Sequence, residues 1–418
     1  MYAEIITIGD ELLIGQTIDT NSAWIAKELN LIGISLFQIT SVADQKDRIL
    51  KALEDASQRV SLVLITGGLG PTSDDITKPT LCEYFQTHLV MNNEVLEGIE
   101  AFFTSVGRPM LESNRQQAML PAACTVLINN RGTASGMWFE KDKVVFVSMP
   151  GVPYEMKGIM EDHVIPKLQQ LFDLPAIYHR TLLTQGIGES FLAEIIRDWE
   201  LSLKKEDIKL AYLPSPGMVK LRLSAYGPHH EELKSKVDRK AEELKGIAGE
   251  FIFGENEESL ESIVAELLKK TGRTLSIAES CTGGYLSHLI TSIPGSSAYF
   301  QGSVVSYSNE IKQEVLGVAK SDLEKYGAVS SEVVEAMAKG VYIRFGSTYS
   351  LAISGIAGPD GGSDEKPVGL VWIALAGPDG ISSHRFIFGK ERSRNIRRAA
   401  LMALDLLRKE LIDTNFAD

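Results

Sequence analysis

The sequence predicts an α/β protein with a doubly wound sheet, because buried strands repeatedly end in glycine-rich loops that lead into helices. In the first third of the chain, apolar runs at residues 2–8, 60–65 and 144–147 have the length and composition of buried strands. Each is followed by a loop that contains glycine. In open α/β sheets, ligands bind beyond the carboxyl ends of the strands. We therefore expect the functional residues of this region in these loops.

The chain has 418 residues, which is too long for one ordinary core and predicts two or three domains. We predict a first domain at residues 1–171, a small middle module at 172–253 and a last α/β domain at 254–418. The middle module is expected to have the order βαββαβ. Its predicted elements are strands at 179–184, 208–213, 219–226 and 250–253 and helices at 191–199 and 231–245.

Composition and charge exclude several classes of function. The net charge of −13 makes the chain a poor candidate for direct nucleic-acid binding. In the middle module the 12 basic and 12 acidic residues between 178 and 250 cancel, which favours a spacer or dimerisation module. The cysteines Cys82, Cys124 and Cys281 are too widely spaced for a disulfide framework or a zinc site. With no signal peptide and no apolar run near 18 residues, we expect no membrane span and a cytoplasmic location.

The most informative segment is Glu-Ser-Cys-Thr-Gly-Gly at residues 279–284. It lies between an apolar strand at 275–278 and a segment with helical spacing at 285–293. At such a turn, the N–H groups and the positive end of the helix dipole can meet an anion. This arrangement suits a nucleophile beside an oxyanion site. The alternative is a helix N-cap followed by a tight turn.

A serine nucleophile needs a base, and the histidines of the chain offer no obvious partner. The segment 303–312 places Tyr307 at a strand end and Lys312 five residues later. Burial can lower the pKa of a lysine towards neutrality, so Ser280 and Lys312 form the simplest pair. Cys281 is the rival nucleophile because a thiol is intrinsically more reactive. Adjacent residues point to different sides, so only one of the two can face the cleft, and the sequence leaves the choice open. A second glycine-rich loop begins at Ser354.

The first domain contains a glycine-rich loop, Gly-Gly-Leu-Gly-Pro-Thr-Ser-Asp-Asp, at residues 67–75. Its N–H groups can face phosphate oxygens, and Asp74 and Asp75 can supply oxygen ligands for a divalent cation. Asp10 and Glu155 lie near other strand ends, so the carboxylates could converge on one cleft where a metal ion activates water. Alternatively, Asp74 and Asp75 are a charge pair at a helix N-terminus.

Several polar side chains of the first domain are candidates for contacts with a nucleotide. Asn21, Asn114 and Gln117 could bind a base or ribose, although each alone is more often a turn or cap residue. Lys78 could neutralise a phosphate, or could be a solvated helix residue.

Taken together, these motifs resemble the CinA (competence/damage-inducible) family over essentially the whole chain. The first domain is similar to the molybdopterin-binding MoaB/MogA-like fold, and the middle segment resembles a KH-type module. The last domain is similar to nicotinamide mononucleotide (NMN) amidohydrolases. The segments that carry the resemblance are 9–11, 67–75, 114–118, 132–136, 150–156, 279–284, 295–297, 307–312, 327–330, 354–362 and 367–369.

The resemblance implies two hydrolytic activities in a homodimer. The last domain would convert NMN to nicotinic acid mononucleotide and ammonia without a cofactor. The first domain would hydrolyse ADP-ribose to AMP and ribose 5-phosphate with a divalent cation (Mg²⁺, Mn²⁺ or Co²⁺), aided by potassium.

The roles carried over to individual residues also come from the resemblance. In the last domain, Ser280 would be the nucleophile, Lys312 the general base, Tyr307 the group that orients them, and Ser354 an aid to binding or activating substrate. The remaining expected contacts are Thr282, Gly283, Gly284, Arg392 and, second to it, Arg397 for NMN; Gly68, Gly70, Thr72, Asn21 and Asn114 for ADP-ribose; and Asp10, Asp75 and Glu155 for the metal.

Two departures from the family pattern stand out. Many relatives have threonine where Ser354 stands, and they have Gly-Asp-Arg where residues 390–392 read Lys-Glu-Arg.

Three alternatives remain beside the two activities. The chain could be an NMN deamidase whose first domain only binds nucleotide, or a non-enzymatic protein of DNA uptake or repair. By fold analogy alone, it could also bind or activate molybdopterin.

Overall fold

The computed structural model describes residues 1–418 except 71, 73–74, 216 and 414–418. The chain divides into two compact units. One unit contains Met1–Tyr178 and the segment Tyr226–Leu233, and the other contains the remaining described residues.

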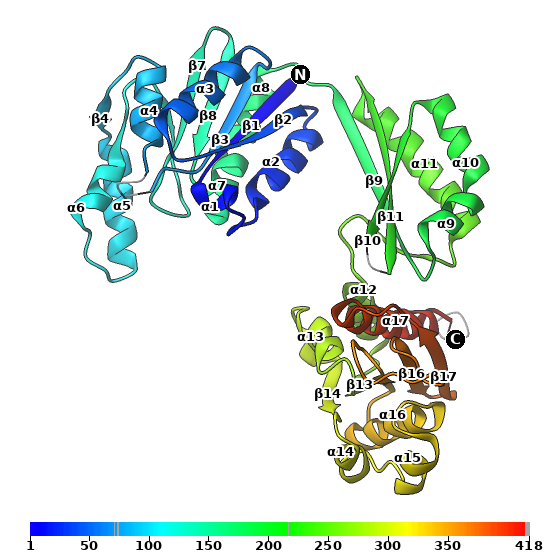
Figure 1. The fold of residues 1–418 in the computed structure, drawn as a ribbon. Coiled ribbons are helices and arrows are strands. Elements are labelled where there is room, and N and C mark those ends of the chain that lie inside the picture. Colours follow the sequence, from blue (N-terminus) through cyan, green and yellow to red (C-terminus); the bar gives the residue numbers. More distant parts are fainter. Residues whose placement is uncertain (71, 73–74, 216, 414–418) are drawn as a thin grey trace. The chain divides into compact units, whose positions relative to one another are not determined.

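The N-terminal domain is built on a six-stranded sheet with the order β2-β1-β3-β8-β7-β6 (Figure 1). Pairs β1/β2, β1/β3 and β3/β8 are parallel, whereas β7/β8 and β6/β7 are antiparallel. The sheet strands are β1 (Tyr2–Ile8), β2 (Ser35–Val42), β3 (Leu62–Thr66), β6 (Thr125–Leu127), β7 (Gly136–Lys141) and β8 (Val144–Met149), and β4 (Leu89–Met91) pairs separately with β5 (Met119–Pro121). The helices are α1 (Asp10–Leu13), α2 (Thr20–Leu31), α3 (Lys46–Ser57), α4 (Thr77–Tyr84), α5 (Asn93–Ser105), α6 (Glu112–Arg115), α7 (Pro153–Ile159), a π-helical turn (Met160–Val164) and α8 (Ile165–Leu171).

Helices cover both faces of this sheet, which confirms the doubly wound prediction. Along β3, Leu62 and Leu64 belong to one apolar cluster and Val63 and Ile65 to another, because successive side chains of a strand point to opposite faces. One cluster includes side chains of α3, α4 and α5, and the other includes side chains of α2, α7 and α8. The sequence therefore shows continuous apolar runs in β1, β3 and β8 rather than alternation.

The middle module has the predicted βαββαβ order and a four-stranded sheet, β10-β11-β9-β12. The predicted first helix is divided in two at Ile196. The elements are β9 (Ala176–Gln185), α9 (Glu189–Ile195), α10 (Arg197–Leu203), β10 (Lys209–Ser215), β11 (Met218–Gly227), α11 (His230–Ala248) and β12 (Ile252–Glu255).

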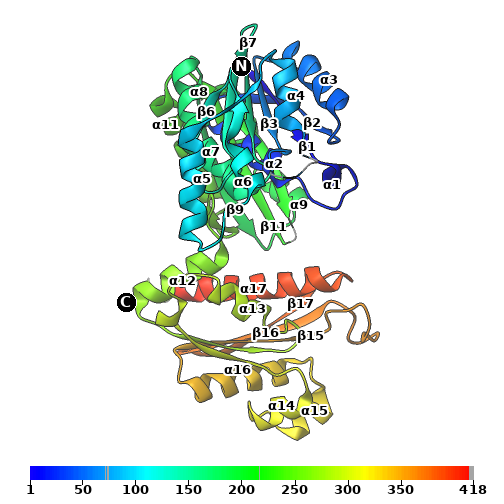
Figure 2. The ribbon, with the colours of Figure 1, turned by 90° about the vertical axis from the view of Figure 1, so that its left-hand side faces the viewer.

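The C-terminal domain contains a five-stranded sheet with the order β14-β13-β15-β16-β17. The three strands β14, β13 and β15 are parallel, and β16 and β17 are antiparallel additions. Figure 2 shows α12, α13 and α17 on one side of this sheet and α14, α15 and α16 on the other. The strands are β13 (Leu275–Glu279), β14 (Phe300–Val305), β15 (Tyr349–Gly355), β16 (Leu370–Gly377) and β17 (Gly380–Ile387). The helices are α12 (Leu260–Thr271), α13 (Tyr285–Thr291), α14 (Asn309–Glu314), α15 (Lys320–Tyr326), α16 (Ser331–Phe345) and α17 (Arg392–Asp413).

A membrane-spanning helix would have to be both long and apolar, and no helix among the described residues meets both conditions. The predicted domain boundaries and the cytoplasmic location stay predictions.

Candidate active sites

Ser280 directly follows β13, the middle one of three parallel strands. Its N–H donates to the carbonyl of Ile353 at 2.9 Å. Glu279 is in register with Ile353 of β15 and Val305 of β14, so the next positions of the three strands bring Ser280, Ser306 and Ser354 side by side. The parallel order thus gathers residues that are distant in sequence at one edge of the sheet.

Lys312 reaches Ser280 from α14, the helix that follows β14. Its Nζ lies 3.1 Å from Ser280 Oγ, 2.7 Å from the Ser306 carbonyl oxygen and 3.4 Å from that of Tyr307. The side chain is only 1% exposed, and burial lowers its pKa. When the amine is neutral, two N–H groups can donate to the carbonyls while the lone pair faces the serine hydroxyl. The structure therefore brings the predicted pair within hydrogen-bonding distance.

Cys281, the rival nucleophile, belongs to an apolar core cluster. It is 7% exposed and packs in the same cluster as Leu286 and Ile290. Burial raises the pKa of its thiol to about 12, so almost no thiolate exists at neutral pH. The geometry therefore favours Ser280, a choice that the sequence left open.

Glu279 holds the start of α13, a role that the sequence analysis missed. Its fully buried carboxylate accepts hydrogen bonds from the N–H groups of Gly284, Leu286 and Ser287 at 2.8–3.1 Å and from the Ser287 hydroxyl at 2.6 Å. A carboxylate at the end of an otherwise apolar strand, just before a helix, was the available signal.

The hydrogen bonds of this turn correct the expectation that Gly283 and Gly284 offer free N–H groups to a substrate. Gly284 donates to Glu279, and Gly283 donates to the Ser280 carbonyl at 3.1 Å. Thr282 is different, because its hydroxyl is buried and has no hydrogen-bond partner within the described chain. Of the three predicted residues, Thr282 retains a polar group that a substrate could use.

Arg392 and Tyr307 form one side of this site. Arg392 Nη2 donates to the Tyr307 hydroxyl at 3.1 Å, and Nη1 donates to the Gly358 carbonyl at 2.8 Å. Arg397 instead lines a separate hollow together with Tyr285 and Leu289. Tyr307 is 61% exposed, its hydroxyl accepts a hydrogen bond from Arg392, and its carbonyl accepts one from Lys312. Tyr307 therefore contacts the predicted pair through its carbonyl, whereas its hydroxyl bonds to Arg392.

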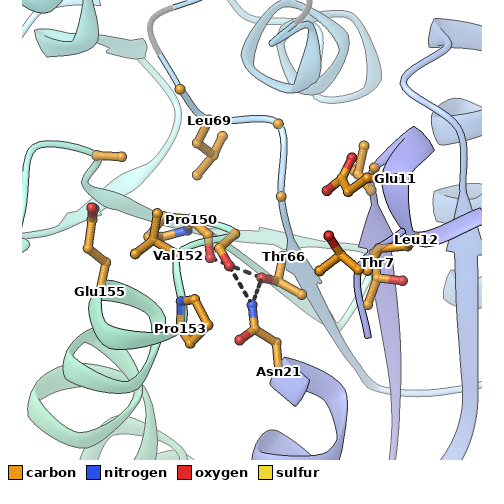
Figure 3. Close-up of a pocket in the computed structure, with 18 of the residues that line it drawn as sticks. Thr7, Glu11, Leu12, Asn21, Thr66, Leu69, Pro150, Val152, Pro153 and Glu155 are labelled. Carbon is orange, nitrogen blue, oxygen red and sulfur yellow. Dashed lines mark hydrogen bonds between the residues drawn. The ribbon is translucent and has the colours of Figure 1, made fainter. Parts of the chain in front are cut away.

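The N-terminal domain contains a cavity of about 470 Å³ at the carboxyl ends of β1, β3 and β8 (Figure 3). Asn21, from the start of α2, donates through Nδ2 to Thr66 Oγ1 at 3.1 Å and to the Gly151 carbonyl at 2.9 Å. These bonds determine which end of the amide is Nδ2. The buried Oδ1 at the other end has no hydrogen-bond partner in the described chain. Asn114 is not among the lining residues; it caps α6 by accepting the Leu111 N–H at 3.0 Å.

The glycine-rich loop is closed by one of its own carboxylates. Asp75 accepts hydrogen bonds from the Gly70 N–H at 2.8 Å, the Thr72 N–H at 3.0 Å and the Thr72 hydroxyl at 2.5 Å. At least two of the N–H groups expected to face phosphate are therefore engaged. Gly68 also lines the cavity, and a Cβ there would lie 2.1 Å from Thr77 Oγ1. Asp74 lies outside the described residues.

The predicted metal ligands Asp10, Asp75 and Glu155 are not gathered into one set. Glu155 accepts from Asn129 Nδ2 at 2.6 Å, and burial raises its pKa. In Figure 3 it lies on the opposite side of the cavity from Glu11, the neighbour of Asp10. Within the part of the chain that the structure describes, no group of three or more His, Cys, Asp or Glu side chains is arranged to hold a metal ion.

Asp44 is an acidic residue of this site that sequence reasoning missed. It accepts the Asp10 N–H at 3.2 Å and lines the cavity. Partial burial raises its pKa, and the nearby carboxylates of Asp10, Glu11 and Asp75 raise it further. The omission follows from overlooking β2, the edge strand that precedes it, whose residues are largely exposed.

Lys78 is buried beside the cavity rather than solvated. Its Nζ donates to the carbonyl of Gln117, a lining residue, at 2.8 Å. Burial lowers its pKa to about 8. The alternative of a solvated helix lysine is therefore wrong.

Comparisons with known proteins cover nearly the whole chain. Family models match at residues 4–170 (probable molybdopterin binding domain), 179–254 (damage-inducible protein CinA KH domain) and 257–411 (CinA C-terminal domain). A CinA-like protein of Cytophaga hutchinsonii is 49% identical over 411 residues, 98% of each chain. One from Flavobacterium psychrophilum is 48% identical over 99% of each. A solved CinA superfamily protein from Klebsiella pneumoniae is 34% identical over 37% of this chain and 96% of its own, with a TM-score of 0.36.

Proposed function

The chain belongs to the CinA family, and from that membership and the Ser280–Lys312 contact we propose that its C-terminal domain hydrolyses NMN to nicotinic acid mononucleotide and ammonia. One observation supports this most strongly: a buried lysine of lowered pKa lies 3.1 Å from a serine hydroxyl at a strand-to-helix turn. A serine with a neutral amine as base is a known arrangement for acyl transfer.

In this mechanism, neutral Lys312 accepts the Ser280 proton as the oxygen attacks the carboxamide carbon. The carbonyl π bond opens to a tetrahedral oxyanion, near which the Thr282 hydroxyl is available as a donor. The C–N bond then breaks, and the departing nitrogen takes the proton from Lys312 to leave as ammonia. Water, deprotonated by the same amine, hydrolyses the acyl-enzyme and releases the acid. Arg392, at the edge of the site, is the residue that we assign to the substrate phosphate.

For the N-terminal domain we propose hydrolysis of ADP-ribose to AMP and ribose 5-phosphate. The supporting features are the cavity at the carboxyl edge of the sheet, the glycine-rich loop and the unpartnered Asn21 Oδ1, which can accept a hydrogen bond from a ribose or base. The crowding of carboxylates around Asp44 fits a divalent cation, which would offset their charge. Such a cation (Mg²⁺, Mn²⁺ or Co²⁺, with potassium as an aid) would polarise the pyrophosphate. Asp44, Asp75 and Glu155 line the cavity and Asp10 does not. Within the described residues no three of these side chains already form a metal site, so a cation would have to draw its ligands together.

Product analysis by mass spectrometry tests both activities. Purified protein is offered NMN and ADP-ribose separately, with and without each divalent cation. We expect ammonia and the acid from NMN regardless of cation, and AMP only when a cation is present. Ser280→Ala should abolish the first reaction and leave the second intact, and Cys281→Ala should retain most of the first. Loss of NMN turnover in Cys281→Ala but not in Ser280→Ala would reverse the assignment.

The alternatives predict different outcomes from the same preparation. A first domain that only binds nucleotide would give no AMP under any cation. A DNA-handling protein would shift DNA in a gel at moderate salt, which the charge of −13 disfavours. The expected homodimer is checked by sedimentation.

A further inference from the structure

The hydroxyl of Ser354 has a fixed direction. Its Oγ lies 2.6 Å from the Ala328 carbonyl oxygen, and the side chain is buried. A carbonyl oxygen can only accept, so the serine proton is committed to Ala328. What Ser354 offers to its other neighbours is therefore an acceptor.

The Ala328 carbonyl is held in place by a lysine from another loop. Lys366 Nζ donates to the carbonyls of Tyr326 at 2.5 Å and Val329 at 2.8 Å, on either side of Ala328. The Ser330 hydroxyl also donates to the Gly327 carbonyl at 3.0 Å. Several carbonyls of the segment 326–330 thus accept hydrogen bonds, and Lys366 donates two of them.

Lys366 itself is anchored, because a turn holds its backbone. Its N–H donates to Ser363 Oγ at 3.1 Å, and the Ser363 N–H donates to its carbonyl at 2.8 Å. The loop 356–369 that carries both residues also accepts the Arg392 bond at Gly358. One loop therefore fixes both the arginine at the edge of the site and, through Ala328, the serine hydroxyl.

Ser354 lies beside the residue to which we assign the nucleophilic attack. By the register of β13 and β15, it is the neighbour of Ser280 on the adjacent strand. A carboxamide bound at Ser280 carries an NH₂ group that can donate to an acceptor, whereas a carboxylate carries only acceptors. Leaving a buried acceptor unpaired disfavours the carboxylate.

We propose that Lys366 is a positioning residue that keeps Ser354 an acceptor, so that the site selects a carboxamide over the corresponding carboxylate. This inference rests on the proposed NMN deamidation. It makes the enzyme bind its substrate in preference to its own product.

Kinetics with product inhibition tests the proposal. The measured quantity is the ratio of the inhibition constant of nicotinic acid mononucleotide to the KM for NMN. In Lys366→Met the segment 326–330 loses two bonds and Ser354 becomes free to donate to a carboxylate, so we expect the ratio to fall about tenfold. Lys366→Arg, which keeps the donors, should restore the ratio.

A double-mutant cycle separates positioning from a general loss of structure. In a Ser354→Ala background, Lys366→Met should leave the ratio unchanged, because the hydroxyl is absent. Ser363→Ala removes a hydrogen bond of the turn and keeps the lysine, so the ratio should fall less than in Lys366→Met. This variant replaces Lys366→Met in the experiment if Lys366→Met does not fold. If the wild type turns over NMN, either of two results would overturn the inference. One is an unchanged ratio in both Lys366→Met and Ser363→Ala, and the other is the same change of ratio for Lys366→Met in the Ser354→Ala background as in the wild type. A wild type that releases no ammonia would instead overturn the proposed function, and the inference with it.

Discussion

The two candidate sites differ in how their polar groups are paired. In the C-terminal domain, Ser280, Lys312, Ser354 and Arg392 form hydrogen bonds with one another or with loops distant in sequence. In the N-terminal domain, Asp75 accepts from Gly70 and Thr72 of its own loop, whereas Asp44 and Glu155 each accept from a residue distant in sequence. The C-terminal site has its proposed catalytic pair in contact before any ligand arrives. In the N-terminal site, the carboxylates expected to bind a metal are not grouped into one set among the described residues. Preorganised chemistry is therefore expected in one domain and ligand-assisted assembly in the other.

The largest expected effect concerns Lys312, on which the preorganised site depends. Lys312→Met should lower kcat/KM for NMN by about 10³-fold, because the base is removed. In the wild type, kcat/KM should rise with pH as the neutral amine forms, and level off below the ordinary lysine pKa of 10.5, since burial lowers that pKa. The exposed Lys320 is a matched control, and Lys320→Met should change neither quantity. A pH profile that rises only near 10.5 would contradict a buried base.

A smaller effect is expected from a substitution of Glu279. It tests whether the buried carboxylate that caps α13 stabilises the turn that carries Ser280. Glu279→Ala leaves three backbone N–H groups without an acceptor, so the free energy of unfolding should fall by about 3 kcal/mol. Urea denaturation followed by circular dichroism measures it. Glu310→Ala, at an exposed position on α14, should cost less than about 0.5 kcal/mol. Equal losses of unfolding free energy in the two variants would show that the Glu279 cap stabilises the protein no more than an exposed glutamate does.

The smallest effect, of opposite sign, is expected from Lys78 in the N-terminal domain. The lowering of its pKa from 10.5 to about 8 means that the unfolded chain binds the proton more tightly. Wild-type stability should therefore rise between about pH 8 and 10.5. Below pH 8, Lys78→Met should stabilise the protein by about 1–2 kcal/mol, after allowing for the lost bond to Gln117. Thermal unfolding across this pH range would show the gain vanishing at high pH, and a gain independent of pH would contradict the sign.

The Ser280–Lys312 pair could be predicted because the histidines offered no obvious partner and burial can lower the pKa of a lysine. The structure adds that both residues follow parallel strands, β13 and β14. The sequence could not choose between Ser280 and Cys281, since only the folded chain shows that Ser280 contacts Lys312 and that Cys281 packs in an apolar cluster. The fold classes followed from buried strands and glycine-rich loops. The edge strand β2 was overlooked because its residues are largely exposed, and Asp44 was lost with it.

Other misses concern side-chain direction, which motifs do not contain. Asp75 and Glu155 stand where a metal site was expected, yet each accepts hydrogen bonds from nearby residues of its own domain. The Tyr307 ring points to Arg392 rather than to Lys312. Such choices depend on contacts between segments that no local pattern specifies.

The hydrogen bonds that Asp75 accepts have a consequence for its affinity towards a cation. Its carboxylate already shares its negative charge with the N–H groups of Gly70 and Thr72 and with the Thr72 hydroxyl. In the hydrolysis proposed for the N-terminal domain, a cation that bound at Asp75 would compete with these three donors for the same two oxygen atoms. The free energy of binding would therefore be smaller than for a carboxylate that water alone solvates.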